Sequence, residues 1–112
     1  MLPNDLLAPR LTWLSIANAD LGYEVLPSIT KLIGLTFLQT CGNAFTDEGV
    51  QQLVALQHLT HLYLEEESLT VAALAFVALL PRLERLGLQD MPLTDEDLER
   101  LRTELPGVGV DR

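Results

Sequence analysis

Residues 35–56 read LTFLQTCGNAFTDEGVQQLVAL, and this stretch decides the fold. It opens with the pattern L-x-x-L-x-apolar at Leu35, Leu38 and Thr40, and the last two of these positions are two residues apart, like Leu14 and Ile16 earlier in the chain, as a short half-buried strand requires. Apolar residues then recur with the spacing of a helical stripe, at Val50, Leu53 and Leu56. The stretch therefore predicts one short strand followed by one helix, which is the size of a single structural repeat.

The same pattern recurs along the 112 residues with a period of 24 and without an insertion. The four units begin at Leu11, Leu35, Leu59 and Leu83. Two further apolar columns keep this phase, at Leu21, Phe45, Leu69 and Leu93 and at Leu26, Val50, Leu74 and Leu98. We therefore expect an N-terminal cap over residues 1–10, four repeats over 11–104 and a truncated strand over 105–112. In that last segment, Leu105, Val108 and Val110 repeat the opening pattern at a spacing of 22.

A threonine precedes three of the four expected helices, at Thr46, Thr70 and Thr94. Its hydroxyl can accept bonds from free N–H groups at a helix start, and the acidic residues after Thr46 and Thr94 favour the positive helix end. Strands are predicted near residues 12–16, 36–40, 60–64 and 84–88, and helices near 23–32, 47–57, 71–80 and 95–104. The fold class is α/β, a short solenoid with parallel strands on one face and helices on the other.

The stretches LTFLQTCGNAFTDEGVQQLVAL and LERLGLQDMPLTDEDLERL, which begin at residues 35 and 83, resemble the leucine-rich repeat family. The resemblance is to its 24-residue, helix-containing variety, similar to ribonuclease inhibitor and to bacterial repeats. The asparagine column of that family is occupied in this chain only by Asn43. Ala19, Glu67 and Met91 stand at the other three places. We expect other groups to satisfy the backbone of the turns there.

The charge of the chain excludes several classes of partner. Lys and Arg number 7 and Asp and Glu number 16, so the formal net charge is −9. This charge disfavours nucleic acids and anionic membranes and favours a basic protein. The longest apolar run, residues 71–80, is too short to cross a bilayer, which needs about 20 residues. Cys41 is the only cysteine, so the chain cannot form an internal disulfide and suits a reducing compartment. We therefore expect a soluble, cytoplasmic protein.

No motif for catalysis, cofactor or metal binding is found in the sequence. The chain lacks a phosphate-binding glycine loop and the usual zinc patterns. His58 and His61 are three residues apart on an extended segment and project differently, so a metal site is not expected. Ser15 lacks the nucleophile elbow of a hydrolase, and Cys41 is interpreted as a small residue at a strand end. We expect a protein without catalytic residues, cofactor or metal.

One column of large planar side chains crosses all four repeats on the side of the sheet away from the leucines. Such residues dominate binding hot spots, although stacking among the rings alone would also explain the column. The residues predicted to bind a protein on this face are Trp13, Phe37, Gln39, His61, Tyr63, Glu65 and Arg85. Acidic residues at the strand ends, including the run from Glu65 to Glu67, are interpreted as a solvated rim.

The third helix differs from the others because its outward positions, assigned with an α-helical period, are all apolar. A helix that is apolar all round is expected to be buried on both sides. We therefore predict a second contact on the convex face, centred on Phe76 and Leu79, although an inward tilt of Phe76 would leave only a minor patch. The residues concerned are Ala72, Ala75, Phe76 and Leu79.

Three functions remain compatible with the sequence. The first is a non-enzymatic module that binds a protein partner through the exposed sheet face. The second is an acidic inhibitor, such as an immunity protein that neutralises a basic toxic nuclease, which the resemblance and the charge of −9 suggest. The third is a structural or adaptor fragment that assembles with itself, as a homodimer through the third helix or through the open end of the solenoid.

Overall fold

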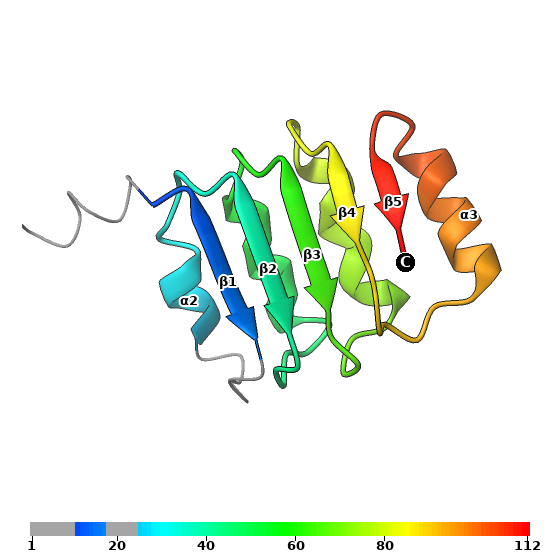
Figure 1. Cartoon of the computed structure of the whole chain (residues 1–112), viewed down its shortest axis with the longest axis horizontal. Coiled ribbons are helices and arrows are strands. Elements are labelled where there is room, and N and C mark those ends of the chain that lie inside the picture. Colours follow the sequence, from blue (N-terminus) through cyan, green and yellow to red (C-terminus); the bar gives the residue numbers. More distant parts are fainter. Residues whose placement is uncertain (1–10, 18–24) are drawn as a thin grey trace, which may run out of the picture.

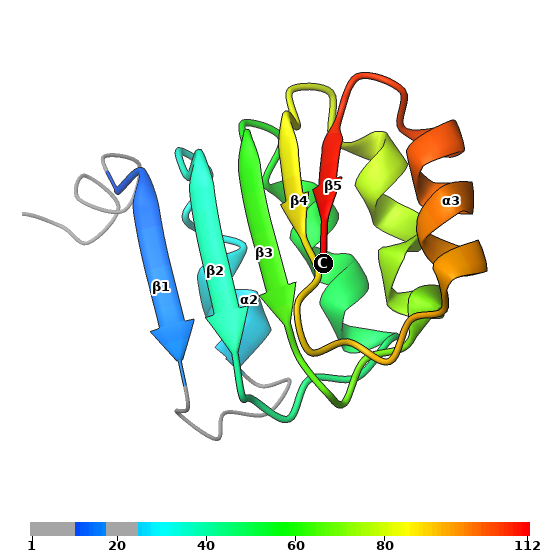
Figure 2. The ribbon, with the colours of Figure 1, turned by 45° about the vertical axis from the view of Figure 1, so that its right-hand side comes forward.

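The computed structural model describes residues 11–17 and 25–112. Their strands form one parallel sheet in the order of the chain. The strands are β1 (Trp13–Ala17), β2 (Phe37–Cys41), β3 (His61–Glu65), β4 (Arg85–Gly87) and β5 (Gly109–Asp111). All helical segments lie behind the sheet, and no described element covers its other face (Figures 1 and 2). The predicted α/β solenoid is confirmed.

Strand register follows the sequence period. Phe37 lies opposite Trp13 and His61 lies opposite Phe37, so each residue pairs with the one 24 positions later. The first four strands begin one residue later than predicted. The expected cap over residues 1–10 and the position of Ala19 lie outside the described residues.

The last strand also keeps the 24-residue register, so the expected spacing of 22 is wrong. Val110, and not Val108, lies opposite Leu86. Val110 is buried whereas Val108 is half-buried. Leu105 ends the preceding helix and does not begin the strand, because its N–H donates to the carbonyl of Leu101 at 2.8 Å.

The helical segments differ in type, and the spacing of their buried residues matches the type of each segment. Buried residues in η3 (Gly49–Ala55) and η4 (Val71–Leu79) recur every third position, which matches a 3₁₀-helix with three residues per turn. In α3 (Asp95–Glu104), the buried Leu98 and Leu101 are followed by Leu105 after four residues, and this segment is α-helical. The prediction that all of them follow an α-helical period is therefore wrong for two.

Helix starts have the expected caps. The Thr94 hydroxyl accepts from the Asp97 N–H at 3.1 Å, and the Asp97 carboxylate accepts from the Thr94 N–H at 3.0 Å. Thr46 and Thr70 accept from N–H groups of η3 and η4 at 2.9 and 3.3 Å. These bonds satisfy donors that have no partner inside a helix.

The segment α2 (Leu26–Ile29) is shorter than the predicted helix over 23–32. Residues 18–24 lie outside the described part. The N–H of Thr30 still donates four residues back, to the carbonyl of Leu26, but the N–H groups of Lys31 and Leu32 donate only three residues back, at 3.3 and 2.9 Å. The continuous α-helix therefore ends at Ile29.

The core is one layer of apolar side chains between the sheet and the helical segments. The inward leucines of the central strands, Leu38, Leu62 and Leu86, are fully buried. Thr40 occupies the next inward position of β2, and its hydroxyl is buried without a hydrogen-bond partner in the described structure.

No helix among the described residues has both the length and the apolar character to cross a membrane.

Candidate functional site

The sheet face is the surface formed by strand side chains that point away from the helical segments. Because neighbouring side chains along a strand point to opposite faces, burial of one set of residues leaves the alternate set on the other side. The sheet face consists of Trp13, Ser15, Ala17, Phe37, Gln39, Cys41, His61, Tyr63, Glu65 and Arg85. The predicted binding residues of β1 to β4 thus share one surface.

Aromatic side chains form a stacked ladder across three strands of the sheet face. The Trp13 and Phe37 ring centroids are 5.1 Å apart with an interplanar angle of 15°, and Phe37 and His61 stack at 6.1 Å and 25°. The Tyr63 ring is tilted against Phe37 at 5.4 Å. Trp13 is 55% exposed, so the ladder presents apolar area to solvent at its first rung.

Threonines at the starts of the strands form hydrogen bonds next to the ladder residues. The Thr36 hydroxyl donates to the Thr12 carbonyl at 3.2 Å, and the Thr60 hydroxyl donates to the Thr36 carbonyl at 3.0 Å. His61 Nδ1 lies 2.9 Å from the Thr60 hydroxyl. The two threonine bonds join the residue before β2 to the residue before β1, and the residue before β3 to the residue before β2.

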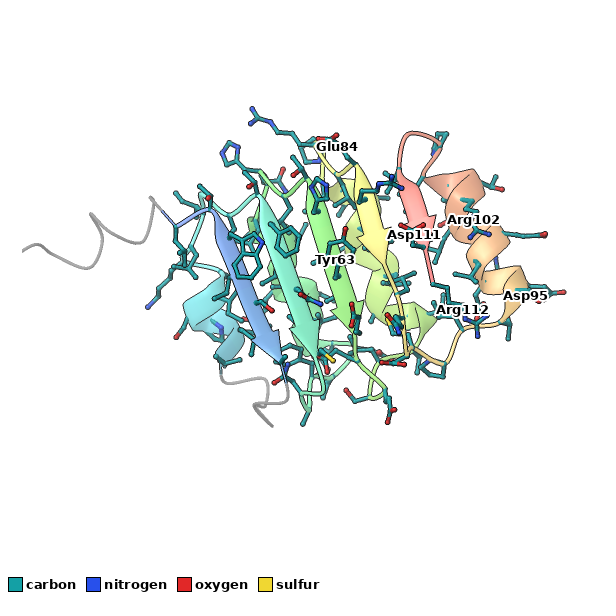
Figure 3. All side chains as sticks on the ribbon, viewed as in Figure 1. Tyr63, Glu84, Asp95, Arg102, Asp111 and Arg112 are labelled. Atoms are coloured by element: carbon teal, nitrogen blue, oxygen red, sulfur yellow. The ribbon has the colours of Figure 1, made fainter. Side chains whose placement is uncertain are left out.

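Two glycines make room for large side chains from the preceding strand. Tyr63 lies opposite Gly87, and a Cβ at Gly87 would overlap the Tyr63 ring, 2.8 Å from Cε1. Arg85 lies opposite Gly109 in the same way, and its Nη1 is 3.7 Å from a carboxylate oxygen of Asp111. Figure 3 shows Tyr63 over the sheet between β3 and β4. Neither glycine is among the residues predicted to bind a partner, although both share columns with predicted site residues.

An acidic depression adjoins the carboxyl ends of β2 and β3. It is lined by Cys41, Gly42, Asn43, Ala44, Glu65, Glu67, Ser68 and Asp90. A hydrogen-bonded chain leads to it across the strands, because the Ser15 hydroxyl donates to Gln39 Oε1 and Gln39 Nε2 donates to Glu65 Oε1, both at 3.3 Å. Glu65 is therefore held at the border between the sheet face and the depression.

Glu66 is fully buried, so its interpretation as part of a solvated rim is wrong. One carboxylate oxygen accepts from the Asn43 backbone N–H at 2.6 Å, and the other accepts from Asn43 Nδ2 at 3.0 Å. Asn43 Nδ2 also lies within donor distance of the carbonyls of Ile16 and Cys41. The asparagine therefore joins three repeats through its bonds to Ile16, Cys41 and Glu66.

The Cys41 thiol, which lines the depression, has a raised pKa. Burial raises the pKa of Cys41 above its ordinary value, and the negative charges of nearby Glu65, Glu66, Asp90 and Glu67 raise it further. Cys41 is a free thiol. Within residues 11–17 and 25–112, no group of His, Cys, Asp or Glu has the geometry to hold a metal ion.

The predicted contact centre on the convex face is corrected by the structure. Phe76 is 2% exposed and belongs to the core, whereas Leu79 is 64% exposed. A 3₁₀-helix has three residues per turn, so Phe76 lies on the same side as Ala73, and both are buried. The outward stripe consists instead of Ala72, Ala75 and Ala78. The convex surface at the third repeat therefore lacks the aromatic side chain on which the predicted contact was centred.

Comparison with known proteins yields structural similarity alone, because no family model and no curated protein matches the sequence. A leucine-rich-repeat protein from Leptospira interrogans is similar over 100% of this chain, with a TM-score of 0.59 and 24% identity. An internalin from Listeria monocytogenes is similar over 95% of the chain, with a TM-score of 0.57 and 20% identity.

The chain spans 28% of the Leptospira protein and 35% of the internalin. In this chain, a parallel strand recurs every 24 residues and a helical segment follows each of the first four strands. The chain therefore has the fold of a leucine-rich repeat protein.

Proposed function

We propose that this chain is a non-enzymatic interaction module that binds a protein partner through the sheet face. The observation that carries the proposal is the stacked ladder that begins at the exposed Trp13 and continues through Phe37 to His61. The core is filled by the inward leucines, so these rings are not needed to fill it. Exposed aromatic area of this kind is typical of binding surfaces, in which aromatic residues contribute most of the affinity.

The rings are positioned before a partner binds. Stacking holds Trp13 against Phe37, and Gly87 holds space for the Tyr63 ring. Side chains that are already ordered lose less rotamer freedom on association, so more of the interaction free energy appears as affinity. No cofactor is part of the proposal. The proposal includes a cytoplasmic location, because the single cysteine is free.

Affinity capture from a lysate of the native host, read by quantitative mass spectrometry, tests the proposal. The bait is the wild-type chain, and the test variant carries Trp13→Ala and Tyr63→Ala. A partner of the sheet face is depleted at least about fivefold on the test variant, since even one hot-spot truncation costs more than about 1 kcal/mol.

Leu79→Gln is the control for the capture, because it removes an exposed apolar side chain from the helical side of the solenoid. Partners of the sheet face are retained on this variant. A reproducible partner captured equally by the wild type and by the double variant would contradict binding through the sheet face.

A further inference from the structure

The acidic depression contains charge that the chain itself does not neutralise. Among the residues that the structure describes, ion pairs join Arg85 to Asp111 and Arg112 to Asp95. None involves the three carboxylates that line the depression, which belong to Glu65, Glu67 and Asp90. Glu67 and Asp90 are exposed, and Glu65 is half-buried. A partner cation could therefore approach these groups without displacing an internal one.

The depression is large enough for the charged end of a side chain. Its volume of about 460 Å³ is many times the roughly 30 Å³ that one water molecule occupies in the liquid. Asn43, one of its lining residues, is held in place by two hydrogen bonds to the carboxylate of the buried Glu66. Gln39 holds the Glu65 carboxylate at its border. A guanidinium group fits this chemistry well, since it donates to carboxylates in a planar, bidentate geometry.

The distance from the depression to the aromatic ladder restricts the partner further. His61 and Glu65 are the first and last residues of β3, and they lie on the same face. Four residues of strand at about 3.3 Å each separate them by about 13 Å. An extended segment of a partner would span that distance in four residues, with one side chain at each end.

We propose that the sheet face recognises a basic segment of a partner protein, in which an apolar side chain packs on the aromatic ladder and an arginine or lysine about 13 Å away enters the acidic depression. This inference rests on the proposed function and names the chemistry of its partner. The negative charge at one end of the face orients the segment, and complementary charge accelerates association and selects among partners.

The test uses a library of short random peptides displayed on phage. Selection on the wild-type chain, with depletion on the Trp13→Ala variant, retains peptides that depend on the aromatic ladder. The affinities of these peptides are then measured for two triple variants of equal charge change. One carries Glu65→Gln, Glu67→Gln and Asp90→Asn at the depression. The control carries Glu96→Gln, Glu99→Gln and Glu104→Gln on exposed positions of α3.

The inference predicts peptides enriched in arginine or lysine about four residues from an apolar residue. They bind the depression variant at least about tenfold more weakly and the control variant within about twofold. Added salt weakens binding to the wild type more steeply than binding to the depression variant. Ladder-dependent peptides without basic residues, or with equal affinity for both triple variants, would overturn the inference and leave the proposed function standing. A selection without any ladder-dependent peptide would overturn both.

Discussion

The Tyr63 ring lies over Gly87 of the neighbouring strand, in the space that a larger residue would fill with its side chain. The position of the ring on the sheet face therefore depends on a residue in the next repeat. Because Tyr63 also contacts Phe37, this glycine influences the aromatic ladder as well.

Gly87→Ala is expected to destabilise the fold by about 1–3 kcal/mol, because the added Cβ overlaps the Tyr63 ring and forces it to move. The measurement is the free energy of unfolding in urea, repeated in a Tyr63→Ala background. In that background the same substitution should cost markedly less, since the overlapping ring is gone. Equal costs in both backgrounds would mean that the ring does not limit the size of residue 87.

Thr40→Val is expected to stabilise the protein by about 1 kcal/mol. It replaces a buried hydroxyl that has no partner in the described structure with a methyl group of similar size. Thr36→Val is the control, since the Thr36 hydroxyl donates to the Thr12 carbonyl and its removal should not stabilise the fold. Thermal and urea unfolding of both variants compare the two effects. A loss of stability in Thr40→Val would show that its hydroxyl is satisfied in solution.

Glu66→Ala is expected to destabilise the fold by about 2–4 kcal/mol, because it leaves two donors of Asn43 without their carboxylate acceptor in a buried turn. Glu67→Ala removes the adjacent glutamate, which is exposed, and should change stability by no more than about 0.5 kcal/mol. Urea unfolding of the two variants distinguishes the neighbours. Similar values for both would argue against the buried position of Glu66.

The Cys41 thiol is expected to react with a disulfide reagent with a pH midpoint above that of a free cysteine, because burial and then Glu65 and its acidic neighbours raise its pKa. Glu65→Gln with Asp90→Asn should lower this midpoint in part, leaving the contribution of burial. Because the folded state binds the thiol proton more tightly than the unfolded state, the neutral Cys41 thiol contributes to folding stability, and this contribution is complete below the unfolded-state pKa. This contribution is lost as pH rises through the folded-state pKa. A midpoint that does not move in the double variant would contradict the electrostatic cause.

Trp13→Ala and Leu62→Ala should separate the two faces of the sheet. Leu62 is fully buried, and its truncation is expected to cost about 2–5 kcal/mol of folding stability. Trp13 is 55% exposed and stacks on one ring, so its truncation should cost no more than about 1.5 kcal/mol. Chemical unfolding monitored by circular dichroism measures both. A larger loss for Trp13→Ala than for Leu62→Ala would place the indole in the core.

The sequence by itself determined the repeat, the fold class and the outward set of strand residues. A period of 24 without insertions places Phe37 beside Trp13 and His61 beside Phe37, because parallel strands in successive repeats align equivalent positions. Alternation along each strand then separates Leu62 from His61 and Tyr63. Both are properties of local spacing, which sequence displays directly.

Only the tertiary structure decided the helix type, the burial of Phe76 and Glu66, and the register of the last strand. Phe76 turns inward because its segment has three residues per turn, a choice made by packing against the core. Glu66 is buried because Asn43 of the preceding repeat provides two donors for its carboxylate. These outcomes depend on contacts between different repeats, and the residue type at one position does not specify what a neighbouring repeat places against it.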